Sequence, residues 1–355
     1  ADGRYLAFVR RVRFDTVLFL HDLESGENIP LYDRLERDLQ ETSGTEGNAP
    51  AIAWTPDSGS IGFWSGGGFH RVDVESGSVT DIPVRVRKEM QVRTTLRHEV
   101  DVAPDSFHVK MPRWANVSPD GKQAVFQAVG VLWTKDLPNG EPRRLTSQND
   151  HFENFPQYSP DGRSIVYTTW DDEEQGSVRI VPASGGEGRV LTSRPGNYIE
   201  PTVSPDGSTV AYYQVSGGYL LSPMWGLETG LYTVPASGGE PMWVTDGGSS
   251  PRFSPDGERI YYVAGAREGL ALESVDLTGR DERTHVKGTN MAELAVSPDA
   301  RWVAFVDDYA VHVAPLATIG KAVSLGKGTK SIPVRKLSGR AGDFLAWQGD
   351  DTVTW

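Results

Sequence analysis

The tetrapeptide Ser-Pro-Asp-Gly occupies residues 118–121, 159–162, 204–207 and 254–257 of this 355-residue chain. Partial copies stand at 1–3 (Ala-Asp-Gly), 55–58 (Thr-Pro-Asp-Ser), 297–300 (Ser-Pro-Asp-Ala) and 348–351 (Gln-Gly-Asp-Asp). The aspartates of successive copies are 41 to 63 residues apart. Repeats of this length that hold several short strands are typical of β-propellers, in which each repeat forms one blade.

Each copy has the composition of a tight turn between two antiparallel strands. Proline fixes φ for the second turn position, aspartate hydrogen-bonds to its own backbone, and glycine accepts the positive φ that rejoins the strand. Apolar triplets follow at a fixed offset and predict the second strand of each repeat, buried between neighbouring sheets. These triplets are Ala124–Phe126, Ile165–Tyr167, Val210–Tyr212, Ile260–Tyr262 and Val303–Phe305.

The eight copies enclose seven intervals, so the sequence predicts an all-β fold with little helix: a seven-bladed β-propeller of four-stranded antiparallel blades. It is expected to fill residues 1–355 as a single domain. Phe344–Trp347 is expected to form the innermost strand beside Tyr5–Val9, because pairing of the two chain ends closes the ring and removes exposed sheet edges. The first turn lacks its preceding strand and the last strand begins a new repeat, so the chain is expected to be a fragment of a longer multidomain protein.

The composition excludes several classes of function. A net charge of −13 argues against a nucleic-acid partner, and the only counter-evidence is the basic cluster of Arg85, Arg87, Lys88 and Arg93. The chain has no cysteine, so it has no disulfide and no thiolate nucleophile. It contains no apolar run of about 18 residues, so no membrane insertion is expected.

The connections between predicted strands differ in length according to the face of the propeller on which they lie. The turns that share a face with Ser-Pro-Asp-Gly are short, whereas the other face is expected to hold every long connection. These long connections are residues 33–49, 88–113, 148–154, 170–176 and 214–230. Loops on a rigid scaffold commonly bind ligands, so this face is either a binding face or a surface that covers the disc and packs on a neighbouring domain.

The sequence lacks the common catalytic and metal-binding motifs. It contains no Gly-x-Ser-x-Gly pentapeptide, which a serine hydrolase would need at its nucleophile, and its seven histidines form no His-x-His pair. The acidic run Asp171–Glu174 lacks the ligand spacing of a calcium loop and fits a solvated hairpin tip better. We therefore assign no catalytic, cofactor-binding or metal-binding residue, and no cofactor, to this chain.

Polar and aromatic side chains that precede the innermost strands form the candidate ligand or partner site. Because each lies at a similar distance before its turn, they are expected to gather at one mouth of the central channel, as a binding site or as an ordinary polar funnel. They are His151, Glu153, Asn154, Asn197, Tyr198, Glu200, Asn290, Glu293 and Arg113. The apolar loop residues Tyr219, Leu221 and Trp225 are added because their loop is too apolar to lie open in water without a partner or a packing role. The carboxylates in this group would favour a cationic group, a metal or a peptide amino terminus.

Three longer runs make the chain similar to a known family. Residues 149–162, 217–226 and 279–285 resemble the TolB-like, tricorn-type propeller region of large bacterial amidohydrolase-related proteins, and the resemblance covers essentially the whole chain. The turn repeat itself is shared by TolB, tricorn-type proteases and prolyl-peptidase propellers. The resemblance implies that the propeller is a middle segment of the parent chain, with a metal-dependent hydrolase barrel downstream. The divalent metal that the resemblance implies belongs to that barrel, whose His-x-His pattern has no counterpart here.

Two classes of function follow from the resemblance. The chain is expected to be a non-catalytic propeller module that shields or gates the active site of an amidohydrolase-type enzyme, with the neighbouring domains of the parent chain as partners. The alternative is a stand-alone propeller that binds a peptide or protein in the TolB manner. The resemblance implies a periplasmic or otherwise extracytoplasmic location in either case.

Overall fold

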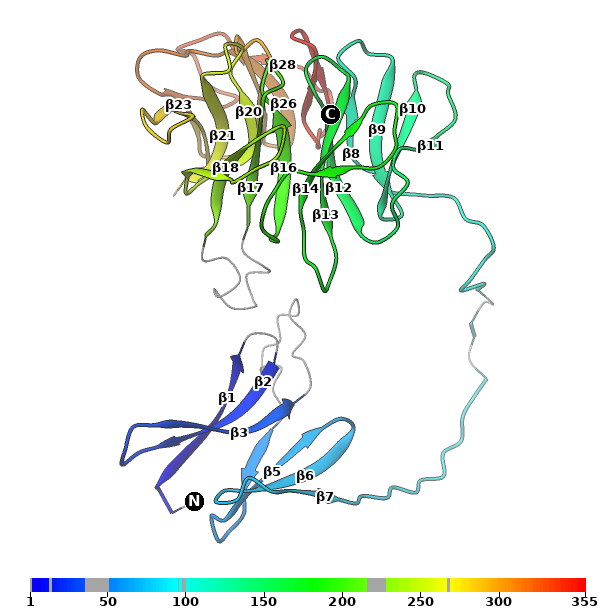
Figure 1. Ribbon diagram of the computed structural model, residues 1–355, viewed down its shortest axis with the longest axis vertical. Helices are drawn as coiled ribbons and strands as arrows, with labels where there is room; N and C mark the ends of the chain where they lie inside the picture. The colour runs from blue at the N-terminus through cyan, green and yellow to red at the C-terminus, as the bar shows by residue number, and fades with distance from the viewer. Residues whose placement is uncertain are drawn as a thin grey trace. The chain divides into compact units, whose positions relative to one another are not determined.

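The computed structural model describes residues 2–12, 15–35, 51–94, 96–97, 100–215, 228–266 and 269–355. The described residues form two compact units, one within residues 2–105 and one from Ser106 to Trp355 (Figure 1). All regular secondary structure in these residues is β-strand, which confirms the all-β prediction. Accordingly, the described residues include no helix long and apolar enough to cross a membrane.

The first unit contains two antiparallel sheets. The three-stranded sheet has the order β1 (Tyr5–Val12), β2 (Asp15–Asp22), β3 (Asn28–Leu35). The four-stranded sheet has the order β4 (Ile52–Trp54), β5 (Ser60–Ser65), β6 (Gly68–Asp73), β7 (Val79–Ile82). Leu18 and Leu20 of β2 pack with Ile61 and Phe63 of β5 in one apolar cluster, so the two sheets share a core.

The second unit contains five sheets of four or more strands and one two-stranded sheet. In sequence order, the sheets are β8 (Arg113–Val117), β9 (Gln123–Ala128), β10 (Val131–Asp136), β11 (Arg143–Arg144); β12 (Phe152–Tyr158), β13 (Ser164–Trp170), β14 (Val178–Pro182), β15 (Arg189–Val190); β16 (Tyr198–Val203), β17 (Thr209–Gln214), β18 (Gly230–Pro235), β19 (Met242–Thr245); β20 (Ser249–Phe253), β21 (Arg259–Ala266), β22 (Gly269–Asp276), β23 (Arg283–Gly288); β24 (Met291–Val296), β25 (Trp302–Asp307), β26 (Ala310–Pro315), β28 (Arg335–Lys336); and β29 (Ala346–Gln348), β30 (Thr352–Thr354). Neighbouring strands among those named here are antiparallel, as the repeat predicts.

The repeated turn has one geometry in all of its strong copies. In the copy between β8 and β9, the Ser118 hydroxyl donates to Asp120 Oδ1 at 2.7 Å, and the backbone N–H of Lys122 donates to the same oxygen at 3.1 Å. The glycine that ends the turn has a φ of 73° at position 121 and 75° at position 207. These values require the left-handed region that glycine adopts without strain, so the residue types explain the turn.

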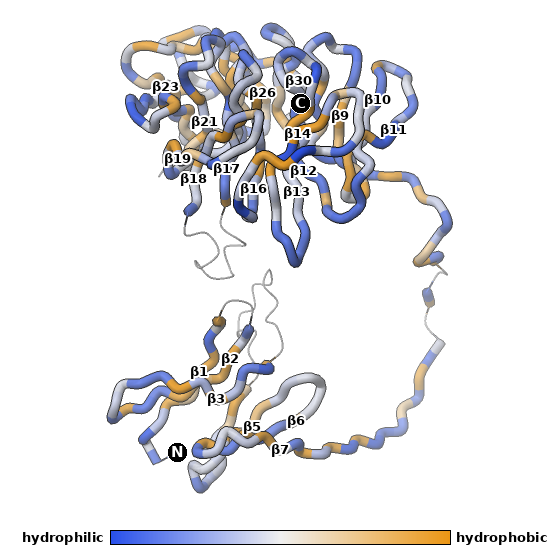
Figure 2. The backbone as a smooth tube through the Cα atoms, viewed as in Figure 1, coloured by the Kyte–Doolittle hydropathy of each residue, from blue (hydrophilic) through white to orange (hydrophobic). Residues whose placement is uncertain are grey.

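The core of the second unit lies in the spaces between successive sheets. Four apolar clusters fill the four spaces from the β8–β11 sheet to the β24–β28 sheet. Figure 2 shows hydrophobic residues of this unit as orange segments along its strands. In four of these sheets, the second strand contributes a large, fully buried aromatic side chain to the cluster between that sheet and the preceding one. These rings are Tyr167, Tyr212, Tyr262 and Phe305, the last residues of the apolar triplets. The predicted burial of the second strands is therefore confirmed.

Two kinds of backbone contact join neighbouring sheets of this unit. The chain leaves β26, pairs in parallel with β23 through β27 (Val323–Ser324), and then returns to its own sheet as β28. Isolated parallel bridges join Thr146 to Gly186 and Thr192 to Gly239 at the outer strands. Such contacts fix the order of the sheets more firmly than side-chain packing alone.

Seven blades with the two chain ends paired stay a prediction, as does a single domain over residues 1–355. In the described residues β1 pairs with β2, and β29 pairs along its whole length with β30. Strand β30 thus occupies the side of β29 that Tyr5–Val9 would need. Of the long connections, the described residues between 83 and 112 form no strand, whereas β12 begins at Phe152 and shortens the connection expected at 148–154.

Candidate functional site

The innermost strands of the second unit share an irregularity four residues before the first residue of each turn. Strands β8, β12, β16, β20 and β24 each shift register against their neighbour near this position. The residues at this position, which we call the bulge residues, are Trp114, Phe155, Glu200, Ser250, Glu293 and Phe344. All but Glu293 have a positive φ, between 48° and 60°. Bulges redirect side chains, and positive φ in bulky residues is a strained conformation that concentrates at functional sites.

The innermost strands of all six sheets of this unit line one central cavity of about 440 Å³. This size lies within the range of small-ligand sites, about 300–1,000 Å³. Five bulge residues contribute to its wall, together with Arg252, Trp347 and a set of apolar residues and prolines. We call this space the channel cavity.

Glu200 and Glu293 line the channel cavity, as the sequence predicted. Each also accepts hydrogen bonds from the backbone of the next sheet. Glu200 accepts a hydrogen bond from the backbone N–H of Ser250, and Glu293 accepts from the N–H groups of Phe344 and Leu345 at 3.0 and 2.7 Å. Burial raises the pKa of both carboxyls, and the nearby Asp343 carboxyl raises the pKa of Glu293 further. Their first role is therefore to join sheets around the channel.

His151 and Glu153 lie away from the channel cavity. The Glu153 side chain is fully buried, and its Oε2 accepts from the Leu132 N–H at 2.7 Å and the Thr146 hydroxyl at 2.8 Å. His151 Nε2 lies 3.8 Å from the other Glu153 oxygen, and His151 lines a second cavity of about 480 Å³ with Asp150 and other polar residues. Burial raises the pKa of Glu153 and lowers that of His151. Both groups are thereby driven toward their neutral forms.

The remaining predicted residues lie in separate places. Asn154, Asn197 and Tyr198 line a cavity of about 320 Å³ that shares Trp114 and Phe155 with the channel cavity. The Arg113 guanidinium lies 5.9 Å from the Trp114 ring centroid, and Asn290 is exposed outside the cavities described here. Tyr219, Leu221 and Trp225 lie outside the described residues. The structure thus distributes the described part of the predicted group over several surfaces.

The residue that the sequence reasoning missed is Arg252 of β20. It lies two residues before its turn and lines the channel cavity. The corresponding residues of the other innermost strands are uncharged: Asn116, Gln157, Thr202, Ala295 and Ala346. Aligning the repeats at the turn would have revealed this single cation. Burial lowers the pKa of the guanidinium from its very high ordinary value, and it remains charged at neutral pH.

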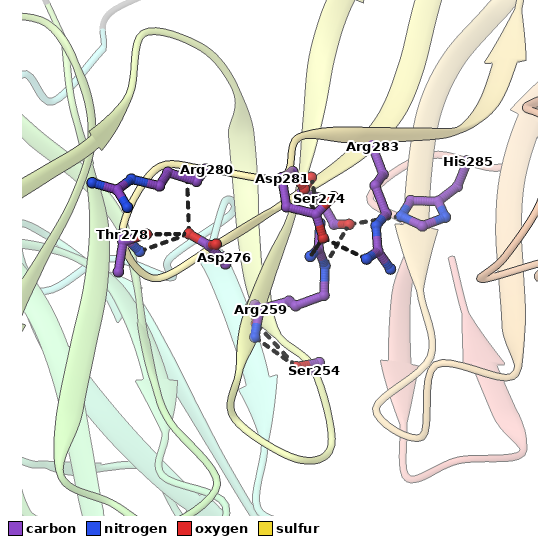
Figure 3. Close-up of polar contacts among 9 residues, drawn as sticks. All are labelled: Ser254, Arg259, Ser274, Asp276, Thr278, Arg280, Asp281, Arg283 and His285. Carbon is purple, nitrogen blue, oxygen red and sulfur yellow. Dashed lines mark hydrogen bonds and ion pairs between the residues drawn. The ribbon is translucent and has the colours of Figure 1, made fainter.

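A serine–histidine pair in the β20–β23 sheet resembles part of a catalytic dyad (Figure 3). Ser274 Oγ and His285 Nε2 are 2.7 Å apart, and the other ring nitrogen lies 3.3 Å from the Ala317 carbonyl oxygen. Ser274 is fully buried, and its hydroxyl also accepts from Arg259 Nε at 3.1 Å. Arg259 in turn pairs with Asp281 at 2.8 Å. No substrate atom can reach this serine, so the pair is a buried structural network.

The described residues also contain no group of three or more metal-ligating side chains. The acidic run at 171–174 uses Asp171 Oδ1 to accept the N–H groups of Glu173 and Glu174, at 2.9 and 2.8 Å. This is the geometry of a turn. The channel cavity, with its mixed polar, aromatic and cationic wall, is therefore the candidate ligand site.

Comparison with known proteins identifies the family. The model of the TolB β-propeller domain, PD40, matches residues 112–325, more than half of the chain. The chain belongs to the TolB β-propeller family. The match falls within the second unit and covers the innermost strands of five of the six sheets that line the channel cavity, from β8 to β24.

Curated relatives match parts of this TolB propeller chain. The uncharacterized peptidase YuxL of Bacillus subtilis is 30% identical over 143 residues, which are 38% of this chain and 20% of the relative. Dipeptidyl-peptidase 5 of Porphyromonas gingivalis is 26% identical over 220 residues, 53% of this chain and 30% of the relative. The matches thus span less than a third of either relative. Among solved structures, TolB from Acinetobacter baumannii is similar with a TM-score of 0.41 and 20% identity, covering 78% of this chain and 62% of that one.

Proposed function

We propose that this chain is a non-catalytic TolB-type propeller module of a larger hydrolase, and that its channel cavity admits and binds peptide-like ligands on their way to an active site elsewhere. The observation that carries the proposal is the channel cavity of about 440 Å³, with strained aromatic and polar residues along its wall.

Two further observations support a module in a peptide-processing protein. Two of the relatives are named as peptidases, and the matched segment is a minor part of each. The described residues that line the cavity include Ser249 and Ser250 but no histidine or lysine that could activate a serine, and the described residues contain no group of three or more metal-ligating side chains. A binding channel coupled to a separate catalytic domain accounts for this combination.

The sequence resemblance extends the proposal to an amidohydrolase-type parent protein. In that parent the propeller would shield or gate a metal-dependent barrel, and the location would be periplasmic. The second candidate function is a stand-alone peptide- or protein-binding propeller in the TolB manner, which the same cavity favours. The coding sequence that flanks this chain discriminates between them, because a downstream barrel with a His-x-His motif is expected only for the first.

The channel function can be tested by trapping peptides on the purified chain. A random hexapeptide mixture is incubated with the chain, and bound peptides are identified by ultrafiltration and mass spectrometry. The variant Ala292→Trp places a large ring at the cavity wall, at an exposed position where little stability depends on the methyl group. Ile319→Trp, at a position that is also exposed, is the matched control.

We expect the chain and the Ile319→Trp variant to retain peptides, the Ala292→Trp variant to lose them, and no peptide to be cleaved. Equal retention by both variants would place binding outside the channel and contradict the proposed site. Cleavage that survives repurification, with and without added zinc or manganese, would contradict the non-catalytic assignment.

A further inference from the structure

We propose that Arg252 binds the C-terminal carboxylate of a peptide in the channel cavity, so that the propeller recognises the carboxyl end of its ligand. This inference rests on the proposed channel function and specifies which end of the peptide the cavity receives. Arg252 would bind the anionic group of the ligand, whereas Glu200 and Glu293 bind backbone N–H groups of the next sheet.

Among the described residues, Arg252 has no carboxylate partner. Among the described residues that line the channel cavity it is the only Lys, Arg or His side chain. Within the described part of the chain, no hydrogen bond or ion pair engages its guanidinium, and burial is the one cause that shifts its pKa. By contrast, the half-buried Arg259 of the same sheet donates to Ser274 and pairs with Asp281. The Arg252 side chain is half-buried and lines the channel cavity, so an incoming anion can reach the guanidinium and supply the charge-assisted pairing that it lacks within the described residues.

The acidic groups around the cavity do not serve as that anion. Glu200 directs its Oε2 to the Ser250 N–H, and Glu293 directs both oxygens to Phe344 and Leu345. Burial and the nearby Asp343 carboxyl raise the pKa of Glu293. Each carboxylate is thereby occupied or partly neutralised by groups of the next sheet. Arg252 keeps a positive field in the cavity although the chain carries a net charge of −13.

The rest of the wall suits a peptide more than an inorganic anion. Trp114 and Phe155, from β8 and β12, have ring centroids 4.2 Å apart and together offer an apolar surface. Gln157 adds an amide that can bond to a peptide backbone. A planar carboxylate matches the fork of the guanidinium, and an apolar terminal side chain would pack on the aromatic pair.

The test compares three forms of one tripeptide, Ala-Ala-Phe, by isothermal titration calorimetry on the full chain. The free acid carries the terminal carboxylate, the C-terminal amide lacks it, and the N-acetylated acid lacks only the amino charge. We expect the free acid and the N-acetylated acid to bind with similar affinity, and the amide to bind at least about tenfold more weakly, because it loses a hydrogen bond between two charged groups.

Arg252 variants locate the effect. Arg252→Gln should reduce the affinity for the free acid to that for the amide, and Arg252→Lys should be intermediate because it keeps the charge but loses the fork. Arg163→Gln is the matched control, since that side chain is 86% exposed beside its own turn. Circular dichroism and thermal unfolding establish that each variant is folded. The ratio of the affinities for the free acid and the amide is measured on the unmodified chain, so this part of the test does not depend on the folding of any variant.

Each unexpected result has a distinct meaning. If the amide binds as well as the acid, the inference is overturned while the channel function stands. If N-acetylation abolishes binding and amidation does not, the cavity receives the amino terminus and the inference is again overturned. If none of the three binds up to about 10 mM, the inference fails, and the hexapeptide experiment with Ala292→Trp then decides the channel function separately.

Discussion

At the residue scale, the side chains at the channel of this propeller act mainly on the backbone of the next sheet. Asn116 accepts from the N–H of Tyr158, Glu200 from that of Ser250, and Glu293 from that of Leu345. The N–H of Ser250 lies at a bulge and that of Leu345 directly follows the bulge residue Phe344, where the regular ladder is interrupted and leaves donors without a strand partner. A polar side chain near the bulge therefore stabilises the junction between two blades.

Glu200→Ala should lower the free energy of unfolding by about 1–3 kcal/mol, because the Ser250 N–H loses a charged acceptor. Glu200→Gln should cost less, since its amide oxygen still accepts. Urea unfolding of the three proteins measures both differences. Unchanged stability in the alanine variant would show that the carboxyl serves a ligand and not the sheet junction.

His285 should make stability depend on pH. Burial lowers its folded-state pKa below its ordinary value of 6.5, so below pH 6.5 the unfolded chain takes up a proton that the folded chain resists. Stability is therefore full above about pH 6.5 and falls as the pH drops toward the lower folded pKa, with a slope of at most about 1.4 kcal/mol per pH unit.

The variant His285→Gln isolates this contribution, because it cannot titrate but can still bond to Ser274. We expect the difference in unfolding free energy between the two proteins to change between pH 7 and 5 and to be constant above pH 7. His151, whose pKa burial also lowers, titrates in both proteins and cancels. Parallel pH profiles would rule out a neutral buried His285.

At the scale of the element, the turn depends on both its aspartate and its last residue. The Ser204 hydroxyl and the backbone and hydroxyl of Ser208 hold the pKa of Asp206 at about 2. Gly207 ends this turn with a φ of 75°, and a Cβ added there would meet nothing within 4 Å. The need for glycine is therefore one of backbone conformation and not of space.

Gly207→Ala should destabilise the chain by about 1 kcal/mol, because alanine is strained in the left-handed region. The reciprocal change is available in a degraded copy, where Ser58 adopts a φ of 61°. Ser58→Gly should relieve that strain and raise the melting temperature of the first unit. Thermal unfolding by circular dichroism compares the pair, and a stabilising Gly207→Ala would contradict the conformational explanation.

At the scale of the whole molecule, the sheet formed by β29 and β30 is too small to be stable by itself. Each of its strands has three residues, and isolated two-stranded sheets are marginal in water. The β1–β3 sheet has three strands, and one more would give it the four strands of its neighbours. This is the physical basis for the predicted seven-bladed closure, which requires Tyr5–Val9 to replace β30 beside Phe344–Trp347.

Closure through the chain ends predicts that a fragment of residues 106–355 melts about 5 °C or more below the second unit of the full chain, because it loses an inter-strand ladder. Differential scanning calorimetry of both proteins measures the shift. An equal melting temperature would contradict seven blades and show that the six sheets around the channel cavity are sufficient without the first unit.

The sequence by itself determined the class of fold and the position of its strands. Glycine, proline and aspartate in the repeated turn act through local backbone preferences, and the apolar triplets act through burial. Both features can therefore be recognised from a short segment of the sequence. It also located Glu200 and Glu293 on the channel wall, because their distance from the turn fixes their place on the innermost strand.

The tertiary structure decided what those residues do. Whether a carboxylate stays free for a ligand depends on which N–H of the next sheet it meets, and that partner lies about 50 residues away in the sequence for Glu200 and for Glu293. His151 lines a different cavity, and the packing of six sheets places Arg252 on the channel wall, where it has no hydrogen-bond or ion-pair partner among the described residues. Burial and pairing are properties of the assembled sheets, so no local pattern in the chain encodes them.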